Sequence, residues 1–316
     1  MNILANDGIS QSGIDALEAN GFNVITTNVA QEQLINFINE NDIVALLVRS
    51  ATTARKELID ACPGLKIIGR GGVGMDNIDV EYAREKGLHV INTPAASSAS
   101  VAELVFAHLY SGVRFLHDSN RNMPLEGETN FKGLKKGYAK GVELRGKTLG
   151  VIGFGRIGQE AAKIGLGVGM NVIAADKFME KATVNVALFN GQSIDVEINT
   201  QSVESVLAEA DFITLHVPAQ KEYVIGETEF GQMKDGAAII NAARGGVIDE
   251  VALLKALDSG KLSFAGLDTF EEEPKPAIQV LMHPKVSLTP HIGAATGEAQ
   301  DRIGVELADQ ISAILA

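Results

Sequence analysis

Short apolar runs alternate with segments of helical periodicity from the first residues of the chain onward. NILA, FNVIT, DIVALLV, LKIIG and LHVIN have the length and composition of buried strands. Between them, segments 10–19, 31–39, 54–61 and 79–86 have the spacing of amphipathic helices. Strands and helices that alternate in this way form βαβ units. The pattern therefore predicts a parallel sheet with helices on both faces.

The alternation stops at the segment NTPAASSAS and starts again later. A long helical pattern follows from about Ser98 to Arg121, and the next 25 or so residues lack periodicity and are expected to form an extended arm. A second series of strands runs through KTLGVIG, MNVIAAD, ADFITLHVP, AAIINAA, LSFAGLD and VSLTP, and an amphipathic helix over 295–314 follows. The sequence predicts an α/β protein with two doubly wound parallel-sheet domains.

One segment departs from this order. Residues 183–199, TVNVALFNGQSIDVEIN, alternate apolar and polar positions on both sides of Asn190-Gly191. Both residues tolerate the positive φ angles of a type I′ turn, so the segment predicts a two-stranded hairpin inserted into the second domain. No functional role is expected for it.

Composition and charge narrow the function. A length of 316 residues with 46% hydrophobic content fits two folded domains. The net charge of −13 repels phosphate backbones and anionic lipids, so nucleic acid and membrane surfaces are not expected partners. The single cysteine, Cys62, forms no internal disulfide, and the amino terminus lacks the pattern of a signal peptide. We expect a cytoplasmic protein that acts on a small molecule, and we expect no metal site.

A glycine-rich loop opens the second series of strands. Gly153, Gly155 and Gly158 have the spacing G-x-G-x-x-G between a strand and a helix, and Asp176 lies 21 residues after Gly155, at the end of the next strand. Glycines let the backbone approach a pyrophosphate, the helix amino terminus attracts its charge, and the acid binds ribose hydroxyls. This arrangement predicts a dinucleotide site, with a structural glycine turn as the weaker alternative.

Three side chains follow later strands of the same series. Arg244 comes after AAIINAA, Glu273 lies in GLDTFEEEP, and His291 follows VSLTP. A guanidinium binds a carboxylate through two hydrogen bonds, and an imidazole beside a carboxylate suits proton transfer. From spacing alone the alternatives are equally strong: a surface arginine in a turn, a solvated acidic run and an inert loop histidine.

Five segments, in chain order, carry a resemblance to a known family. GVGMDNID, GFGRIG, NAARGGVIDE, GLDTFEEEP and TPHIGAAT resemble the D-isomer-specific 2-hydroxyacid dehydrogenases, over essentially the whole chain. The resemblance implies a Rossmann NAD-binding domain, here about 98–286, inserted into a flavodoxin-like substrate domain made of about 1–97 and 287–316. It also implies that the cofactor is NAD.

The same resemblance implies roles for individual residues. Arg244 would bind the carboxylate and carbonyl of the substrate, His291 would be the acid/base, and Glu273 its partner. Val73 and Gly74 would give backbone N–H groups to the substrate carboxylate. The implied cofactor contacts, besides the three glycines, are Arg156 and Ile157 at the pyrophosphate, Asp176 at the ribose, Val217 and Pro218 near the adenosine, and Ala242, Ala243, Arg244, Asp268, His291, Gly293 and Ala294 around the nicotinamide.

Within the family, the nearest resemblance is to phosphoglycerate dehydrogenases. Arg49 and Ser50, at the end of a strand in LLVRSATT, match residues that would bind a 3-phosphate, although an ordinary strand-end arginine paired with a surface acid is the alternative. Because the chain ends at Ala316, no C-terminal regulatory domain is expected. A homodimer is expected through the helix and arm of 98–145.

Other functions remain open at this point. The first alternative is a hydroxypyruvate or glyoxylate reductase, or another D-2-hydroxyacid dehydrogenase. A different class is an NAD-sensing corepressor that acts through protein contacts. A formate dehydrogenase is disfavoured, because TPHIGAAT lacks a glutamine before its histidine.

Overall fold

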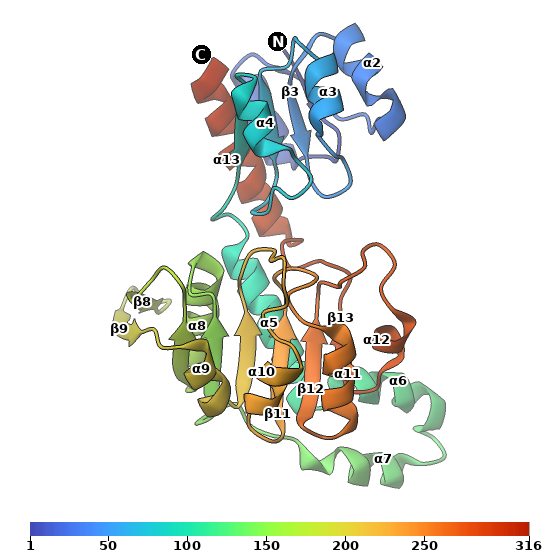
Figure 1. Cartoon of the computed structure of the whole chain (residues 1–316), viewed down its shortest axis with the longest axis vertical. Helices are drawn as coiled ribbons and strands as arrows, with labels where there is room; N and C mark the ends of the chain where they lie inside the picture. The colour runs from blue at the N-terminus through green and yellow to red at the C-terminus, as the bar shows by residue number, and fades with distance from the viewer. Residues whose placement is uncertain (316) are drawn as a thin grey trace. The chain divides into compact units, whose positions relative to one another are not determined.

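A computed structural model describes residues 1–315 and divides the chain into two compact units (Figure 1). The first unit contains Met1–Ser100 and Ala294–Ala316, and the second contains Val101–Gly293. From the sequence, the second unit was expected to end at about residue 286, but Val286–Leu288 is a strand of the sheet of this unit. Hydrogen bonding of this strand therefore keeps the chain in the second unit for a few residues longer than expected. Among the described residues, no helix is long and apolar enough to cross a membrane.

The first unit contains a five-stranded parallel sheet in the order β2-β1-β3-β4-β5. This is the strand order of flavodoxin-like folds, as predicted. The strands are β1 (Asn2–Ala5), β2 (Asn23–Ile25), β3 (Ile43–Val48), β4 (Ile67–Arg70) and β5 (His89–Asn92). The helices are α1 (Gln11–Ala19), η1 (Gln31–Gln33), α2 (Leu34–Glu40), α3 (Lys56–Ala61), α4 (Val80–Glu85) and α13 (Gly297–Leu315).

Two apolar clusters cover the two faces of this sheet. One contains side chains of α2, α3 and α4, and the other contains side chains of α1 and α13. Helices α1 and α13 cross where two glycines meet: a Cβ atom on Gly13 would lie 2.7 Å from the Cα atom of Gly304. The missing side chains allow this close approach, which brings the C-terminal segment of the unit onto its N-terminal segment.

The second unit contains a six-stranded parallel sheet in the order β13-β12-β11-β10-β6-β7. Its strands are β6 (Thr148–Ile152), β7 (Asn171–Ala175), β10 (Phe212–Leu215), β11 (Ala237–Asn241), β12 (Leu262–Leu267) and β13 (Val286–Leu288). The crossover helices are α8 (Arg156–Val168), α9 (Val203–Glu209), α10 (Glu227–Gln232), α11 (Glu250–Asp258) and α12 (Ile278–Met282). The two clusters of buried apolar residues on its faces complete a Rossmann-type domain.

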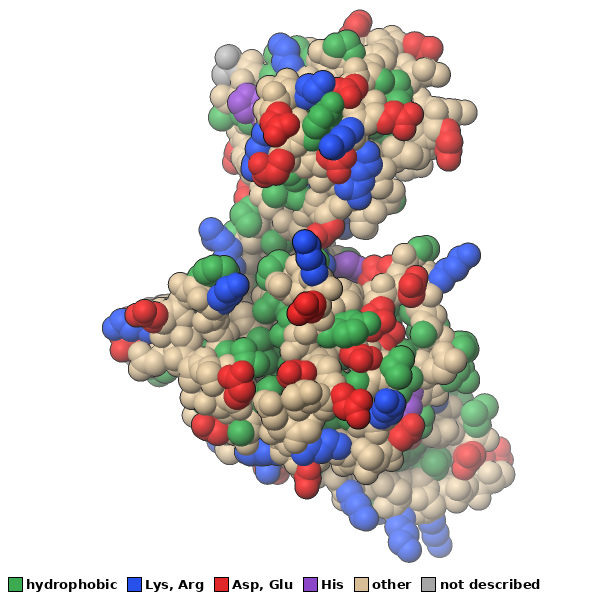
Figure 2. Space-filling model, viewed as in Figure 1, with side chains coloured by type: hydrophobic (Ala, Val, Ile, Leu, Met, Phe, Trp, Pro, Cys, Tyr) green, Lys and Arg blue, Asp and Glu red, His purple; other side chains and the backbone are tan. Residues whose placement is uncertain are grey.

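The segment between the two series of strands is helical, and the expected extended arm is wrong. Helix α5 (Ser98–Val113) ends before Phe115, whose φ of 56° breaks the helical path. The chain continues through α6 (Leu116–Glu126), α7 (Phe131–Gly137) and η2 (Tyr138–Lys140). The Tyr138 hydroxyl donates to Asp118 at 2.8 Å and accepts from Asn122, so hydrogen bonds between distant turns stabilise helices with little apolar periodicity. Lysines gather on α7 (Figure 2).

The predicted hairpin is present as β8 (Lys181–Ala187) and β9 (Ser193–Asn199), which pair with each other in antiparallel register. Its turn differs from the prediction, because only Gly191 has a positive φ. The Gly191 N–H donates to the Leu188 carbonyl, and the Leu188 N–H donates to the Gln192 carbonyl. This pattern is a three-residue connection with one left-handed glycine, in place of a two-residue type I′ turn.

The glycine contact between α1 and α13 gives a test of the packing in the first unit. Gly304→Ala places a Cβ atom about 3.0 Å from the backbone of Gly13 and closer still to the Ser10 hydroxyl. We expect it to lower the free energy of unfolding by about 1–3 kcal/mol, as overpacking does. Gly297→Ala, in the same helix but with open space around its Cβ, is the control. Equal stability of the two variants in urea titrations would contradict this account.

Candidate active site

The loops that carry the predicted residues of the second unit leave one edge of its sheet. The carboxyl ends of parallel strands all lie at the same edge, where ligands bind in open α/β sheets. β6 leads into the glycine loop, β7 into Asp176, and β11 into Arg244. β12 and β13 lead into the segments that contain Glu273 and His291.

The glycine loop has the shape that a pyrophosphate needs. Gly153 has a φ of 92°, and a Cβ atom there would lie 2.5 Å from the His216 carbonyl oxygen. A Cβ on Gly158 would lie 2.2 Å from the Gly153 carbonyl oxygen, so this glycine lets α8 approach the strand. A Cβ on Gly155 would meet no atom within 4 Å, which leaves room above the loop. Arg156 and Ile157 begin α8, where the first N–H groups of a helix lack intrahelical partners.

Asp176 lies at the end of β7 and is fixed by backbone donors. Its Oδ2 atom accepts a hydrogen bond of 2.7 Å from the Phe154 N–H, within the glycine loop. Its Oδ1 atom accepts from the N–H groups of Phe178 and Met179 at 2.8 and 3.1 Å. The carboxylate therefore lies directly beside the loop, as a ribose-binding acid must. Neighbouring Lys177 is exposed.

Arg244 projects from a loop that packs closely on its neighbour. The Asn241 amide donates to the Arg244 carbonyl at 2.8 Å, and its side-chain oxygen accepts from the Ala243 N–H. A Cβ atom on Gly245 would lie 1.7 Å from the Phe270 carbonyl oxygen, so only glycine fits there. The two loops that follow β11 and β12 therefore hold each other. Arg244 is half-buried, and one guanidinium nitrogen also donates to the Ala243 carbonyl.

Glu273 and His291 form a hydrogen-bonded pair. The Nδ1 atom of His291 lies 2.9 Å from Oε2 of Glu273, while the other carboxylate oxygen accepts from the Phe270 N–H. The side chains are 43% and 36% exposed for His291 and Glu273, so a ligand can reach the free Nε2 atom of the imidazole. His291 has a φ of 54°, a left-handed conformation that few non-glycine residues adopt. A carboxylate on Nδ1 fixes the imidazole tautomer and leaves Nε2 for proton transfer.

A buried carboxylate holds the segment around this histidine. Asp268 is 1% exposed and accepts from the N–H groups of Ile292 and Gly293, both at 2.8 Å. The other predicted contacts of the second unit lie in loops at the same edge: Ala242 and Ala243 after β11, and Val217 and Pro218 after β10. Ala294 falls at the start of the first unit's second segment.

The predicted substrate residues of the first unit lie at the carboxyl edge of their own sheet. Arg49 and Ser50 follow β3, and Val73 and Gly74 lie in the loop after β4, the next strand of the sheet. The sequence reasoning missed the side chain that shapes this segment. Asp7 accepts from the N–H groups of Arg49 and Thr52 at 2.6 and 3.0 Å. The sequence contains a signal for it, because Asp7 comes two residues after the first strand and therefore lies at the same edge of the sheet.

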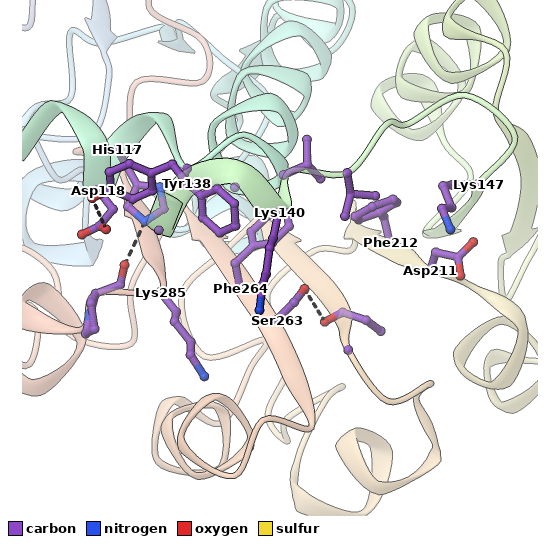
Figure 3. A pocket seen from close by; sticks show the side chains of 18 of the residues that line it. His117, Asp118, Tyr138, Lys140, Lys147, Asp211, Phe212, Ser263, Phe264 and Lys285 are labelled. Carbon is purple, nitrogen blue, oxygen red and sulfur yellow. Dashed lines mark hydrogen bonds between the residues drawn. The ribbon is translucent and has the colours of Figure 1, made fainter. Parts of the chain in front are cut away.

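A cavity of about 790 Å³ lies elsewhere in the second unit, at the amino ends of β10, β11 and β12 (Figure 3). Its lining includes Tyr138, Lys140, Asp211 and Phe264. It lies at the opposite edge of the sheet from the glycine loop and His291, so it is separate from the predicted chemistry. Within residues 1–315, no group of three or more His, Cys, Asp or Glu side chains could hold a metal ion.

A doubly wound domain with a glycine loop, an acid beside that loop and a histidine–carboxylate pair at the same sheet edge is typical of NAD-linked enzymes. The model of the D-isomer specific 2-hydroxyacid dehydrogenase, NAD binding domain, matches residues 106–293, which is more than half of the chain. The chain belongs to this family, and its cofactor is NAD.

Individual relatives agree with this assignment. The chain is 41% identical to a D-3-phosphoglycerate dehydrogenase of Methanocaldococcus jannaschii, over 100% of this chain and 57% of that protein. It is 42% identical to a hydroxypyruvate reductase of Thermotoga maritima, over 91% of this chain and 89% of that protein. The solved structure of the TT0316 protein from Thermus thermophilus superposes with a TM-score of 0.86 at 29% identity, covering 100% and 97% of the two chains. The chain spans about half the length of the phosphoglycerate dehydrogenases it matches.

The position of Asp176 predicts the choice between the two nicotinamide cofactors. The 2′-phosphate of NADPH would face this carboxylate, so we expect NADH to bind about 100-fold more tightly, with Lys177 preventing complete exclusion. Asp176→Ala should reduce the ratio of the affinity for NADH to the affinity for NADPH at least about tenfold. Titration by nicotinamide fluorescence measures both constants, and Glu180→Ala, which removes an exposed acid nearby, is the control. Equal affinity of the intact protein for NADH and NADPH would contradict the assignment of Asp176.

Proposed function

We propose that the protein is an NAD-dependent dehydrogenase that interconverts a D-2-hydroxy acid and its 2-oxo acid. The observation that carries the proposal is the contact of 2.9 Å between His291 and Glu273, at the same sheet edge as the glycine loop and Asp176. Family membership supports the reaction class. The NAD-sensing corepressor is the alternative from a different class, and turnover of NADH with 2-oxo acids separates the two.

The residues of the chain divide the chemistry as follows. NAD, when bound, accepts or supplies the hydride. Glu273 accepts the Nδ1 proton of His291, so in alcohol oxidation the free Nε2 atom takes the hydroxyl proton, and in reduction it returns a proton to the carbonyl oxygen. Arg244 supplies a permanent positive charge that binds the carboxylate and stabilises negative charge that develops on the oxygen. In this proposal Asp268, Gly293 and Ala294, with Ala242 and Ala243, contact the nicotinamide.

We propose 3-phosphoglycerate and 3-phosphohydroxypyruvate as the substrate pair, the first step of serine biosynthesis. Several relatives with 37–41% identity are D-3-phosphoglycerate dehydrogenases. The physical support comes from Arg49 and Ser50, a cation and a hydroxyl at the carboxyl edge of the first sheet. Arg244 already serves the carboxylate, so a second cation suits a second anion. Val73 and Gly74 add backbone N–H groups for the carboxylate.

A reductase for hydroxypyruvate or glyoxylate is the second candidate. The hydroxypyruvate reductase of T. maritima matches this chain over most of both lengths, unlike the longer phosphoglycerate dehydrogenases. For an unphosphorylated substrate, Arg49 would have no second anion to bind. Substrate preference therefore separates the two candidates.

We further propose that the protein forms a homodimer through α5 and the helical arm. Helix α5 and the arm that follows it, α6 and α7, expose several large apolar side chains to solvent, which a partner surface would cover. They are Tyr110 at 42%, Leu116 at 49%, Met123 at 42%, Leu125 at 79% and Phe131 at 57% exposure.

The proposed roles of His291 and Arg244 predict different kinetic defects. His291→Ala should lower kcat by about 10²–10⁴-fold, because general acid/base help is lost, while NADH binds as before. Arg244→Ala should raise KM for the 2-oxo acid and also lower kcat, because the cation acts on the ground state and on the developing charge. Lys275→Ala removes an exposed cation close to Glu273 in sequence and is the control. Near-normal turnover by the His291 variant would refute its role.

The substrate proposal predicts a preference for the phosphorylated 2-oxo acid. We expect kcat/KM for 3-phosphohydroxypyruvate to exceed that for hydroxypyruvate and glyoxylate, and Arg49→Ala to remove most of the difference. A charged hydrogen bond of roughly 1.5–3 kcal/mol corresponds to a loss of about 10- to 150-fold. Arg55→Ala removes an arginine from the same loop that is paired with Asp79 at 3.0 Å, and it should change little. If the intact protein prefers the unphosphorylated acids, the reductase is the correct function.

A further inference from the structure

A buried histidine on α5 is connected by hydrogen bonds to the loop of the proposed acid/base. His108 is 2% exposed, and its Nε2 atom lies 3.0 Å from the Thr289 hydroxyl. That hydroxyl donates to Oδ1 of Asp268 at 2.6 Å. Asp268 in turn accepts from the backbone N–H groups of Ile292 and Gly293, the two residues after His291. All of these groups belong to the second unit.

Counting protons fixes the direction of each hydrogen bond. Thr289 has one hydroxyl proton, and it goes to the Asp268 carboxylate, so Thr289 must accept from His108. His108 therefore carries its proton on Nε2 and accepts on Nδ1, where the Ser287 hydroxyl lies at 2.9 Å. Burial lowers the pKa of His108 to about 4, so the ring is neutral near pH 7. In this assignment the Ser287 hydroxyl gives its one proton to Nδ1 at 2.9 Å, in preference to its longer contact of 3.4 Å with the Ser111 hydroxyl.

The position of His108 is determined by close packing of α5 on the sheet. A Cβ atom on Gly266, in β12, would lie 2.7 Å from the His108 Cβ atom. Glycine at that position lets the imidazole reach Ser287 and Thr289, which lie about 180 residues later in the chain. If the ring turned away, Thr289 would lose its donor, Ser287 would lose its contact of 2.9 Å, and the buried imidazole would lose both of its partners, which is costly.

These hydrogen bonds lead from His108 to the loop of His291, and the backbone of that loop must be held in an unusual conformation. His291 has a φ of 54°, and a non-glycine residue keeps such a conformation only when its surroundings fix it. The Asp268 carboxylate supplies that support through Ile292 and Gly293. The orientation of the carboxylate depends on the Thr289 hydroxyl, and the hydroxyl is oriented by the donor on His108.

We propose that His108 is a positioning residue, which acts through Thr289 and Asp268 to hold the loop of His291 in the geometry for proton transfer. His108 touches neither substrate nor cofactor in this proposal. The inference rests on the proposed role of His291 as the acid/base, and it is independent of the identity of the 2-oxo acid.

The test compares two substitutions that each preserve one half of the imidazole. Glutamine places an amide nitrogen near the position of Nε2, and asparagine places an amide near that of Nδ1. His108→Gln keeps the donor to Thr289 and should retain kcat within about threefold. His108→Asn and His108→Leu lose the donor to Thr289. They should lower kcat by about 10- to 100-fold, which is the usual effect when a catalytic group is slightly misplaced. KM for the 2-oxo acid and the affinity for NADH should change less than about threefold.

Two controls separate this role from general stability and from the proposed function. Phe106→Leu alters another buried position of α5, one that has no polar group. When kcat is measured well below the melting temperature of this variant, it should be unchanged. Amide hydrogen exchange of residues 286–296 reports on the loop without any turnover, and exchange should be at least about tenfold faster in the Asn and Leu variants than in the Gln variant.

The outcomes are distinct. Normal kcat and normal exchange in His108→Asn would overturn the proposal, as would a glutamine variant that is no better than the asparagine variant. If the intact protein reduces no 2-oxo acid, the proposed function fails, while the exchange measurement still decides whether His108 holds the loop.

Discussion

The register of the second sheet is the constraint on which the site depends. In each pair of neighbouring strands, a residue near the carboxyl end of one strand lies opposite a residue near the carboxyl end of the other. Because parallel strands in this register end together, all six loops leave the sheet at one level. The level residues, from one edge strand to the other, are Ala175, Ile152, Leu215, Asn241, Leu267 and Leu288.

The loops gain their shape from contacts that exclude larger or apolar residues. Gly153 and Gly245 lie against carbonyl oxygens at distances that no Cβ atom tolerates. Asp268 is buried and uses both carboxylate oxygens to bind backbone N–H groups. A buried carboxylate without such donors would be strongly destabilising, so its hydrogen bonds and the loop conformation require each other. The same principle applies in the first unit, where Asp7 holds the segment of Arg49.

The sequence predicted the fold class and the strands well, because parallel strands buried on both faces are nearly continuous apolar runs. It predicted the glycine loop with Asp176 and the grouping of the catalytic candidates, because the carboxyl ends of strands converge. The helix predicted to end at Arg121 covered the start of α6, but the rest of α6 and all of α7 were missed, because contacts such as Tyr138 with Asp118 stabilise them and leave no periodic signal. The hairpin turn was assigned the wrong type because Asn190-Gly191 also fits a three-residue connection with one left-handed glycine.

His108 shows why buried polar networks are difficult to predict from a sequence. In VAELVFAHLYSGV a histidine on an apolar helix face has no local feature that distinguishes it from a core residue. Its partners become visible only when β13 is added beside β12 and brings Ser287 and Thr289 under α5. An apolar residue at position 108 would avoid the cost of desolvating an imidazole, but it would remove one hydrogen-bond partner from each of the hydroxyl groups of Ser287 and Thr289. The intact network is therefore stable, but substitution of any one member weakens it. This is the behaviour expected of a network that fixes the loop of His291.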